Sequence, residues 1–258
     1  MDHLLTDKVA VVYGAGGAIG SAVAQAFARE GARVYASGRT LEKVQKVAEE
    51  IVAAGGSAEA AQVDALDEEA VDRHLSEVAD REGGVDVSIN AIGFPAVQGT
   101  PLTELAHADF AYPIATWTST QFLTARAAAR HMVPNGRGVI LTLTASPARV
   151  AIAGAGGFGV ACAAIEGLTR TLAAELGPNG VRVVCIRPHR IGDSNFGAEF
   201  EADPRAGAEF RSWLEDMTLL KRLPTLDEVA STAAFLASDH AGAMTGVVAD
   251  LTGGMSVN

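Results

Sequence analysis

The stretch KVAVVYGAGGAIGSAVAQAFAREG, residues 8–31, decides the fold. Its first part, KVAVVYG (8–14), is a short apolar run that ends in glycine, which is typical of a buried strand. The part AIGSAVAQAFAREG (18–31) has the apolar spacing of a helix. Glycines between them allow a tight turn, and the helix N-terminus offers free N–H groups to a pyrophosphate. The stretch predicts a strand–turn–helix unit that binds a nucleotide, although glycine-rich turns also serve packing alone.

The same alternation of short apolar strands and helices continues along the chain. Near-continuous apolar strands separated by helices indicate a mainly parallel sheet with helices on both faces, because parallel strands need crossover connections. We therefore expect an α/β doubly wound Rossmann fold, with residues 1–258 as a single domain. Expected strands are 8–14, 32–38, 58–64, 85–93, 138–146, 181–188 and 246–254; expected helices are 18–31, 41–56, 68–84, 109–132, 156–177 and 225–239.

Two features of the C-terminal part add to this alternation of strands and helices. The segment 193–222 is polar, charged and aromatic, and we interpret it as a lid over the site. Thr225, with Glu228 three residues later, predicts a capping box at the start of the last helix.

Composition excludes several classes of protein. The chain has 258 residues, 48% of them apolar, which suits one domain with a sizeable core. A net charge of −11 argues against nucleic acid, because phosphate binding needs a basic face. No apolar run reaches the ~18 residues of a membrane span, and the start lacks signal-peptide features. Cys162 and Cys185 are too few for a disulfide framework and are not spaced as metal ligands. We expect a cytoplasmic protein without a metal, whose partner is a small molecule.

The ends of the second and third strands bear on which nucleotide is bound. A carboxylate at position 38 would bond the ribose 2′-hydroxyl and repel a 2′-phosphate. Here Gly38 is followed by Arg39, which favours NADP(H) over NAD(H) unless Arg39 is an ordinary surface residue. Asp64 either accepts from the adenine amino group or caps the strand end.

Several motifs together resemble those of the short-chain dehydrogenase/reductase family over nearly the whole chain. The family's phosphate loop TGxxxGIG appears as YGAGGAIG (13–20), its NNAG turn as NAIG (90–93), and its C-terminal pattern as DEVASTAAFLASDHAGAMTG (227–246). The resemblance implies a Rossmann fold and a nicotinamide cofactor. The residues expected to contact that cofactor are Gly14, Gly16, Gly17, Ile19, Gly20, Arg39, Asp64, Asn90, Ala91, Gly93, Pro188 and Ile191.

The catalytic positions depart from the family's pattern. The family uses an asparagine, a serine, a tyrosine that protonates the carbonyl oxygen, and a lysine that lowers the tyrosine's pKa. The matching positions here are Trp117, Ala145, Phe158 and Cys162. No shift of frame restores them, because the last tyrosine is Tyr112 and none of the four lysines lies on the helix at 156–177. The resemblance thus implies an atypical member with a degenerate tetrad.

Other residues are candidates for a catalytic role. Ser146 follows the family's serine position by one residue, but strand alternation would point it to the other face unless the strand has ended. Cys162 replaces the lysine and would face the cofactor, or it simply packs, since cysteine is among the most buried residue types. His189 follows the sixth strand at the sheet edge where α/β sites lie, or it is merely solvated.

Further substitutions near these positions have competing interpretations. Asp193 stands where the family has a threonine, and a carboxylate there would repel a pyrophosphate. Arg149 and Arg190 suit an anionic or acyl-carrier-bound substrate, or are ordinary surface residues. Trp117 and Phe158 either fill space or stack on a flat, unsaturated substrate.

Three functions are compatible with the sequence. The first is NADP(H)-dependent hydride transfer to a small apolar or conjugated substrate. The second is a catalytically inactive nucleotide- or ligand-binding protein, and the third is an isomerase or dehydratase that binds no cofactor and uses His189 or Cys162 as base. Family members commonly form tetramers through the helices expected at 109–132 and 157–177, so we expect a homo-oligomer, a dimer or tetramer.

Overall fold

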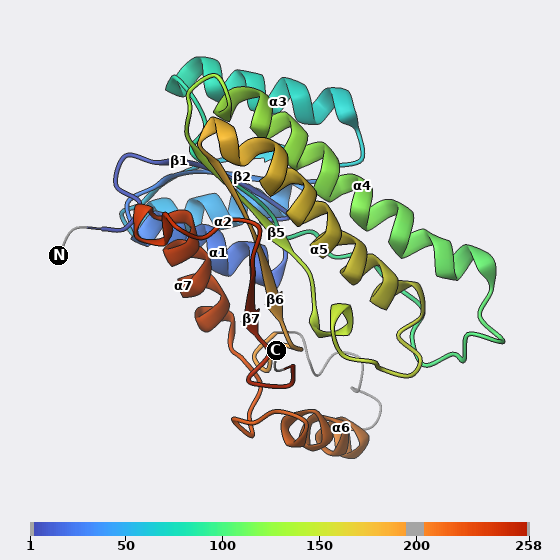
Figure 1. The fold of residues 1–258 in the computed structure, drawn as a ribbon. Helices are drawn as coiled ribbons and strands as arrows, with labels where there is room; N and C mark the ends of the chain where they lie inside the picture. The colour runs from blue at the N-terminus through green and yellow to red at the C-terminus, as the bar shows by residue number, and fades with distance from the viewer. Residues whose placement is uncertain (1–2, 195–203, 257–258) are drawn as a thin grey trace.

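The computed structural model describes residues 3–194 and 204–256. One parallel seven-stranded sheet, ordered β3-β2-β1-β4-β5-β6-β7, runs through them (Figure 1). The strands are β1 (Val9–Tyr13), β2 (Arg33–Gly38), β3 (Ser57–Gln62), β4 (Val87–Asn90), β5 (Gly138–Leu143), β6 (Val181–Pro188) and β7 (Val248–Leu251). The helices are α1 (Ala18–Arg29), α2 (Leu41–Ala53), α3 (Glu68–Glu82), α4 (His107–Met132), α5 (Gly156–Leu176), α6 (Pro204–Asp216) and α7 (Leu226–Ala237). The predicted doubly wound α/β Rossmann fold is confirmed.

Helices cover both faces of the sheet. Alternate side chains of β1 pack against the helices of one face and of the other. Ala10 and Val12 belong to the apolar core shared with α1, α2 and α7. Val9, Val11 and Tyr13 belong to the core shared with α3, α4 and α5. Successive side chains of a strand point to opposite faces, so a strand buried on both sides is apolar throughout. Figure 1 shows the two helical layers on either side of the sheet.

Five strands end earlier than the sequence predicted, and for β4 and β5 a local interaction turns the chain. β4 was expected to reach residue 93 but ends at Asn90, whose side-chain oxygen accepts from the Ile92 N–H at 3.0 Å. β5 was expected to reach residue 146 but ends at Leu143. A short 3-10 turn, η1 (Ser146–Ala148), follows it, with Pro147 supplying a fixed φ and no N–H for the ladder. Ser146 therefore lies beyond the strand, and strand alternation does not govern its direction.

The segment interpreted as a lid contains α6, which lies beyond the carboxyl ends of β6 and β7 (Figure 1). A guanidinium N–H of Arg211 on this helix donates to the Gly192 carbonyl at 3.1 Å, and the Arg190 guanidinium lies 5.8 Å from the centre of the Phe210 ring. Residues 195–203 of the predicted lid lie outside the described residues.

Helix α7 begins as its sequence predicted. The Thr225 hydroxyl accepts from the Glu228 N–H at 3.2 Å, and the Glu228 carboxylate accepts from the Thr225 N–H at 2.9 Å, which completes the capping box. Among the described residues, no helix combines the length and apolar character needed to cross a membrane.

A buried ionic cluster fixes the carboxyl end of β6 against its neighbours. The Arg187 guanidinium donates to Glu166 on α5 and to Asp250 on β7, each at 2.8 Å. The Arg187 side chain is only 4% exposed. A charge buried so deeply needs its partners, because an unpaired buried ion is strongly destabilising. The cluster therefore holds the chain firmly just before Pro188 and His189 leave the sheet.

Candidate functional site

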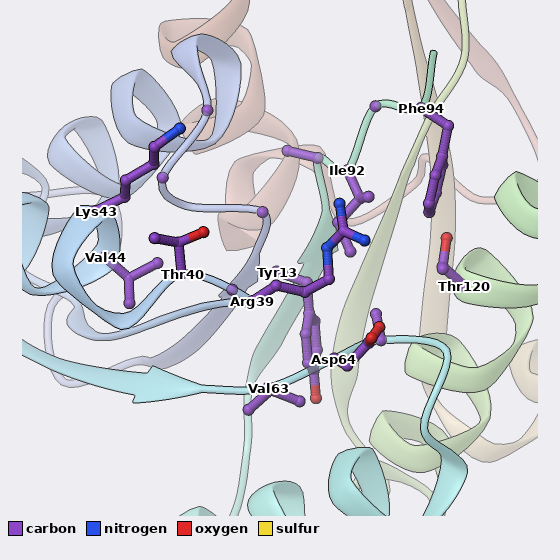
Figure 2. A pocket seen from close by; sticks show the side chains of 17 residues that line it. Tyr13, Arg39, Thr40, Lys43, Val44, Val63, Asp64, Ile92, Phe94 and Thr120 are labelled. Atoms are coloured by element: carbon purple, nitrogen blue, oxygen red, sulfur yellow. The ribbon is translucent and has the colours of Figure 1, made fainter. Parts of the chain in front are cut away.

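A cleft of about 280 Å³ opens at the carboxyl ends of β1, β2 and β4. The strand order reverses between β1 and β4, and open α/β sheets bind their ligands at such a switch point. Figure 2 shows the side chains around it. The residues that line the cleft are Tyr13, Gly14, Gly16, Gly17, Gly38, Arg39, Thr40, Lys43, Val44, Val63, Asp64, Ala65, Ala91, Ile92, Gly93, Phe94 and Thr120.

The turn between β1 and α1 depends on two positions without a side chain. Gly14 has φ +78°, and a Cβ there would lie 2.9 Å from the Ala91 carbonyl carbon. A Cβ on Gly20 would lie 2.2 Å from the Gly14 oxygen, closer than packed atoms approach. The helix behind the turn begins at Ala18 with no side-chain cap and no acidic residue in its first turn. Its free N–H groups and positive dipole end therefore remain available, and they fit the pyrophosphate of a dinucleotide.

Two cationic side chains flank the cleft at the end of β2. Arg39 follows the strand and Lys43 lies in the first turn of α2, and both are exposed (Figure 2). The sequence analysis found Arg39 but missed Lys43. The position of Lys43 in the first turn of the helix that follows Arg39 was the signal that could have found it. Two cations beside the position where β2 lacks a carboxylate suit an anionic group of the ligand.

Asp64 lines the cleft. The structure also shows its other predicted role, as a cap at the end of the strand. One carboxylate oxygen accepts from the Leu66 N–H at 3.0 Å, so Asp64 does cap the end of β3. The carboxylate also borders the cleft, so both interpretations of Asp64 are compatible with the structure (Figure 2).

The remaining predicted cofactor residues divide into two groups. Ala91 and Gly93 line the cleft, while Asn90 is buried behind it, where its amide donates to the Thr124 hydroxyl at 3.1 Å. Asn90 therefore shapes the turn that carries the cleft wall. The residues that lie outside the cleft lining are Ile19, Gly20, Asn90, Pro188 and Ile191.

Tyr13 forms part of the cleft floor, a contribution that the sequence analysis did not foresee. Its ring packs edge-on against His74, with 6.3 Å between ring centres. His74 in turn bonds the Ser37 hydroxyl at 2.8 Å, and burial lowers the pKa of His74 to about 4. Burial also raises the pKa of Tyr13 well above its usual range. This floor is neutral at physiological pH.

Aromatic rings fill the positions that the family resemblance assigns to the reaction centre. Trp117 and Phe158 stack with 5.3 Å between ring centres and 9° between ring planes. Trp117 is buried, and its indole N–H has no hydrogen-bond partner within residues 3–194 and 204–256. Phe94 packs against this pair and also lines the nucleotide cleft, so the cleft leads to the aromatic cluster.

Cys162 lies beneath the aromatic pair and is fully buried. Burial raises the pKa of its thiol to about 12, despite hydrogen bonds with Thr144 and the Ala145 backbone. A thiol with this pKa stays protonated at neutral pH, so the geometry supports the packing interpretation of Cys162 rather than a role as base.

Ser146 and His189, which come from different loops, meet at the same sheet edge. The Ser146 Oγ lies 3.0 Å from His189 Nδ1, and both residues are buried. The alternative that His189 is solvated is therefore wrong, because the residue is only 5% exposed. The sequence placed both residues at this edge but could not show that they pair.

The remaining charged candidates lie outside the cleft lining. The Asp193 carboxylate accepts from the Leu226 N–H at 2.8 Å, so it neutralises the N-terminus of α7 instead of facing the glycine turn. Arg149 is exposed beyond η1, and Arg190 contacts the ring of Phe210 on α6. In the part of the chain that the structure describes, no cluster of three or more His, Cys, Asp or Glu side chains is arranged to hold a metal ion.

Comparison with known proteins supports the geometry. A family profile described as enoyl-(acyl carrier protein) reductase matches residues 14–256. The chain belongs to the short-chain dehydrogenase/reductase family. Gluconate 5-dehydrogenase of Gluconobacter oxydans is 29% identical, covering 98% of this chain and 96% of that protein. D-threitol dehydrogenase of Mycolicibacterium smegmatis is 30% identical, covering 99% and 95%.

A solved structure of the same family agrees with the fold over its whole length. It is named as an NAD(P)-dependent gluconate 5-dehydrogenase from Beutenbergia cavernae and holds NADP at low occupancy. Its TM-score is 0.86 at 31% identity, and the match covers 99% of each chain. Family membership and this likeness make the chain an oxidoreductase-family protein with a site of the kind that takes nicotinamide nucleotides.

Substituting Gly14 tests the close approach at the turn. We expect Gly14→Ala to lower both the melting temperature and the affinity for nicotinamide nucleotides, because the new Cβ meets the Ala91 carbonyl carbon. Gly55→Ala is the matched control, since Gly55 also has positive φ but a Cβ there meets nothing within 4 Å. The control should lose only about 1 kcal/mol of stability and bind nucleotide normally. Equal nucleotide affinity in both variants would contradict the assignment of the turn.

Proposed function

We propose that this protein is an atypical oxidoreductase of the short-chain dehydrogenase/reductase family. It uses NADP(H), and its substrate is small and apolar or conjugated. The observation that carries the proposal is the joining of two features in one continuous region. A cleft with a helix N-terminus and two cations leads through Phe94 to an aromatic cluster that has no proton donor of the tyrosine type.

The preference for NADP(H) rests on the charges around the cleft. Arg39 and Lys43 both line the cleft, and Gly38 supplies no competing carboxylate, which supports binding of a 2′-phosphate by these cations. The glycine turn and the N-terminus of α1 would hold the pyrophosphate. When bound, the nicotinamide supplies or accepts a hydride; the protein's own residues hold the cofactor and the substrate.

The restricted substrate class follows from the aromatic cluster. Phe158 has no ionisable group, and Cys162 cannot take the place of the lysine because its thiol is buried and neutral. Positioned acid–base chemistry typically contributes about 10²- to 10⁴-fold in rate. Proximity of the reacting groups can still contribute strongly, so substrates that need little protonation at oxygen remain accessible. The stacked rings of Trp117 and Phe158 suit a flat, unsaturated substrate.

We also propose that the protein acts in the cytoplasm on a small molecule, and that neither nucleic acid nor a membrane is a partner. This proposal rests on the acidic composition and on the two buried cysteines, neither of which forms a disulfide in the described chain.

The cofactor preference is tested by replacing Arg39. NADP⁺ should bind more tightly than NAD⁺, and Arg39→Ala should remove that preference. A charge-assisted contact contributes about 1.5 to 3 kcal/mol, which is roughly 10- to 150-fold in Kd. Lys43→Ala should produce a smaller loss, and Lys46→Ala on the same helix, outside the cleft, should produce none. Calorimetric titration with both nucleotides measures this, and equal affinity of the unmodified protein for NADP⁺ and NAD⁺ would refute the preference.

The missing acid is tested with simple carbonyl compounds. At pH 7 with NADPH, the protein should reduce cyclohexanone and aliphatic aldehydes barely above background, measured by loss of nicotinamide absorbance. The double variant Phe158→Tyr with Cys162→Lys should fold but stay slow, because groups that act as a unit are not additive and Trp117 and Ala145 remain. Turnover of cyclohexanone by the unmodified protein at ~1 s⁻¹ or faster, the ordinary enzymatic range, would contradict the proposal.

We also propose a dimer or tetramer assembled through α4 and α5. These helices pack against each other and leave large apolar side chains exposed, including Tyr112 (46%), Phe122 (42%) and Val160 (45%). Light scattering at micromolar concentration should give two or four times the mass of 26.5 kDa. Phe122→Glu should shift the protein toward the monomer, since a charge at the centre of an interface is costly. A monomeric unmodified protein would rule out this assembly.

A further inference from the structure

The described part of the chain contains two buried serine–histidine pairs, which lie at different places along the sheet edge. Ser37 and His74 lie under the nucleotide cleft, where the serine bonds Nε2. Ser146 and His189 lie at the carboxyl edge of β5 and β6, where the serine bonds Nδ1. The second nitrogen of His189, Nε2, is buried and has no hydrogen-bond partner among the described residues.

The pairing with Ser146 restricts the state of His189. If the serine hydroxyl donates to Nδ1, the proton sits on Nε2 and becomes a buried donor without an acceptor, which is unfavourable. If Nδ1–H donates to the serine oxygen, Nε2 presents a lone pair instead. The 3.0 Å contact is compatible with both arrangements, and only the second leaves Nε2 with a lone pair that can accept a proton.

Neighbouring residues place this nitrogen beside the reaction centre. Ser146 directly follows Ala145, which packs in the cluster of Trp117 and Phe158. The indole N–H of Trp117 in the same cluster is a second buried polar atom without a partner in the described chain. Each of these two unpaired buried atoms could bond a hydroxyl group of a ligand.

Burial is the main reason that the imidazole is neutral. Burial, with a smaller contribution from the Arg190 charge, lowers the pKa of His189.

Among the described residues, the other titratable or charged groups on the neighbouring elements give it no carboxylate that lacks a partner of its own. Glu166 on α5 and Asp250 on β7 are both bound by Arg187, Arg149 beyond η1 is cationic, and Cys162 is protonated. A neutral histidine at pH 7 can accept a proton but does not readily donate one to a carbonyl oxygen.

We propose that His189 is the general base for oxidation of an alcohol, and that Ser146 is the residue that positions it. The inference rests on the proposed function and names the substrate class: an alcohol whose carbinol carbon bears a flat, unsaturated group, as in an allylic or benzylic alcohol. The hydroxyl proton passes to His189 Nε2. The C–H hydrogen leaves with its electron pair as hydride to NADP⁺, the C=O bond forms, and the substrate is oxidised by two electrons as NADP⁺ is reduced.

The first test reads the state of His189 without any cofactor or substrate. Long-range ¹H–¹⁵N correlation spectra of the labelled protein report which imidazole nitrogen carries the proton, with His189→Gln and His189→Asn each identifying the signal. The expected result is an Nδ1–H tautomer at pH 7 and a pKa below the ordinary 6.5. Ser146→Ala should shift the tautomer toward Nε2–H. An Nε2–H tautomer in the unmodified protein, or a cationic imidazole at pH 7, would overturn the proposal.

The second test measures oxidation of cinnamyl alcohol and benzyl alcohol with NADP⁺, beside cyclohexanol. Both unsaturated alcohols should be oxidised faster than cyclohexanol. His189→Gln should lower kcat about 10²- to 10⁴-fold, the usual contribution of a general base, and Ser146→Ala should lower it less while shifting the pH profile. In the unmodified protein, kcat/KM should rise with pH through a value below 6.5 and then stay level. His131→Gln removes another serine–histidine pair, Ser76 with His131 at 3.5 Å, away from the cleft lining, and should leave that profile unchanged.

Titration with NADP⁺ in the same preparations distinguishes failure of the proposed function from failure of the assignment of the base. If NADP⁺ does not bind, the proposed function itself is wrong, and so is the assignment of His189 as the base. If NADP⁺ binds but no alcohol is oxidised, or His189→Gln is as active as the unmodified protein, the assignment of the base is wrong while the cofactor assignment stands. Conversion of an unsaturated alcohol without any nucleotide would assign His189 to an isomerase or dehydratase instead, and would overturn the oxidation.

Discussion

The site depends on the absence of side chains at Gly14 and Gly20. These positions allow the end of β1 to touch the Ala91 backbone and allow the first turn of α1 to lie directly behind Gly14. As a result the helix N-terminus, the end of β2 and the turn after β4 converge on one cleft. The placement of the cleft's cations and of Phe94 in its wall follows from this convergence.

The two ends of the site have different chemical characters, and the difference defines the protein. At the nucleotide end, the N–H groups at the start of α1 and the cations Arg39 and Lys43 favour a negatively charged group of a ligand. At the other end, Trp117 and Phe158 stack on each other and offer no acid. The ion cluster of Arg187 holds β6 in place, so that His189 leaves the sheet next to Ser146. The proposed base, His189, would remove a proton from an alcohol, whereas neither Trp117 nor Phe158 can deliver one to a ketone.

The fold was predictable because its pattern is local and repeated. Apolar runs and glycine stops place the elements within a few residues, and the capping box at Thr225 and Glu228 appears as predicted. The strand ends at Asn90 and Leu143 were not predictable, since a side-chain bond to Ile92 and the placement of Pro147 decide them. The sequence also placed Ser146 and His189 at one edge. Their pairing needs two loops separated by some forty residues to meet, and no local pattern records that contact.

The most direct test of this account is a crystal structure of the protein grown with NADP⁺. The account predicts the pyrophosphate against the N–H groups at the start of α1, and the 2′-phosphate within hydrogen-bond distance of Arg39, with Lys43 beside it. It also predicts the nicotinamide at the carboxyl edge of β5 and β6, facing the aromatic cluster and the side of His189. A nucleotide bound elsewhere, or a 2′-phosphate pointing into solvent away from both cations, would contradict the central claim.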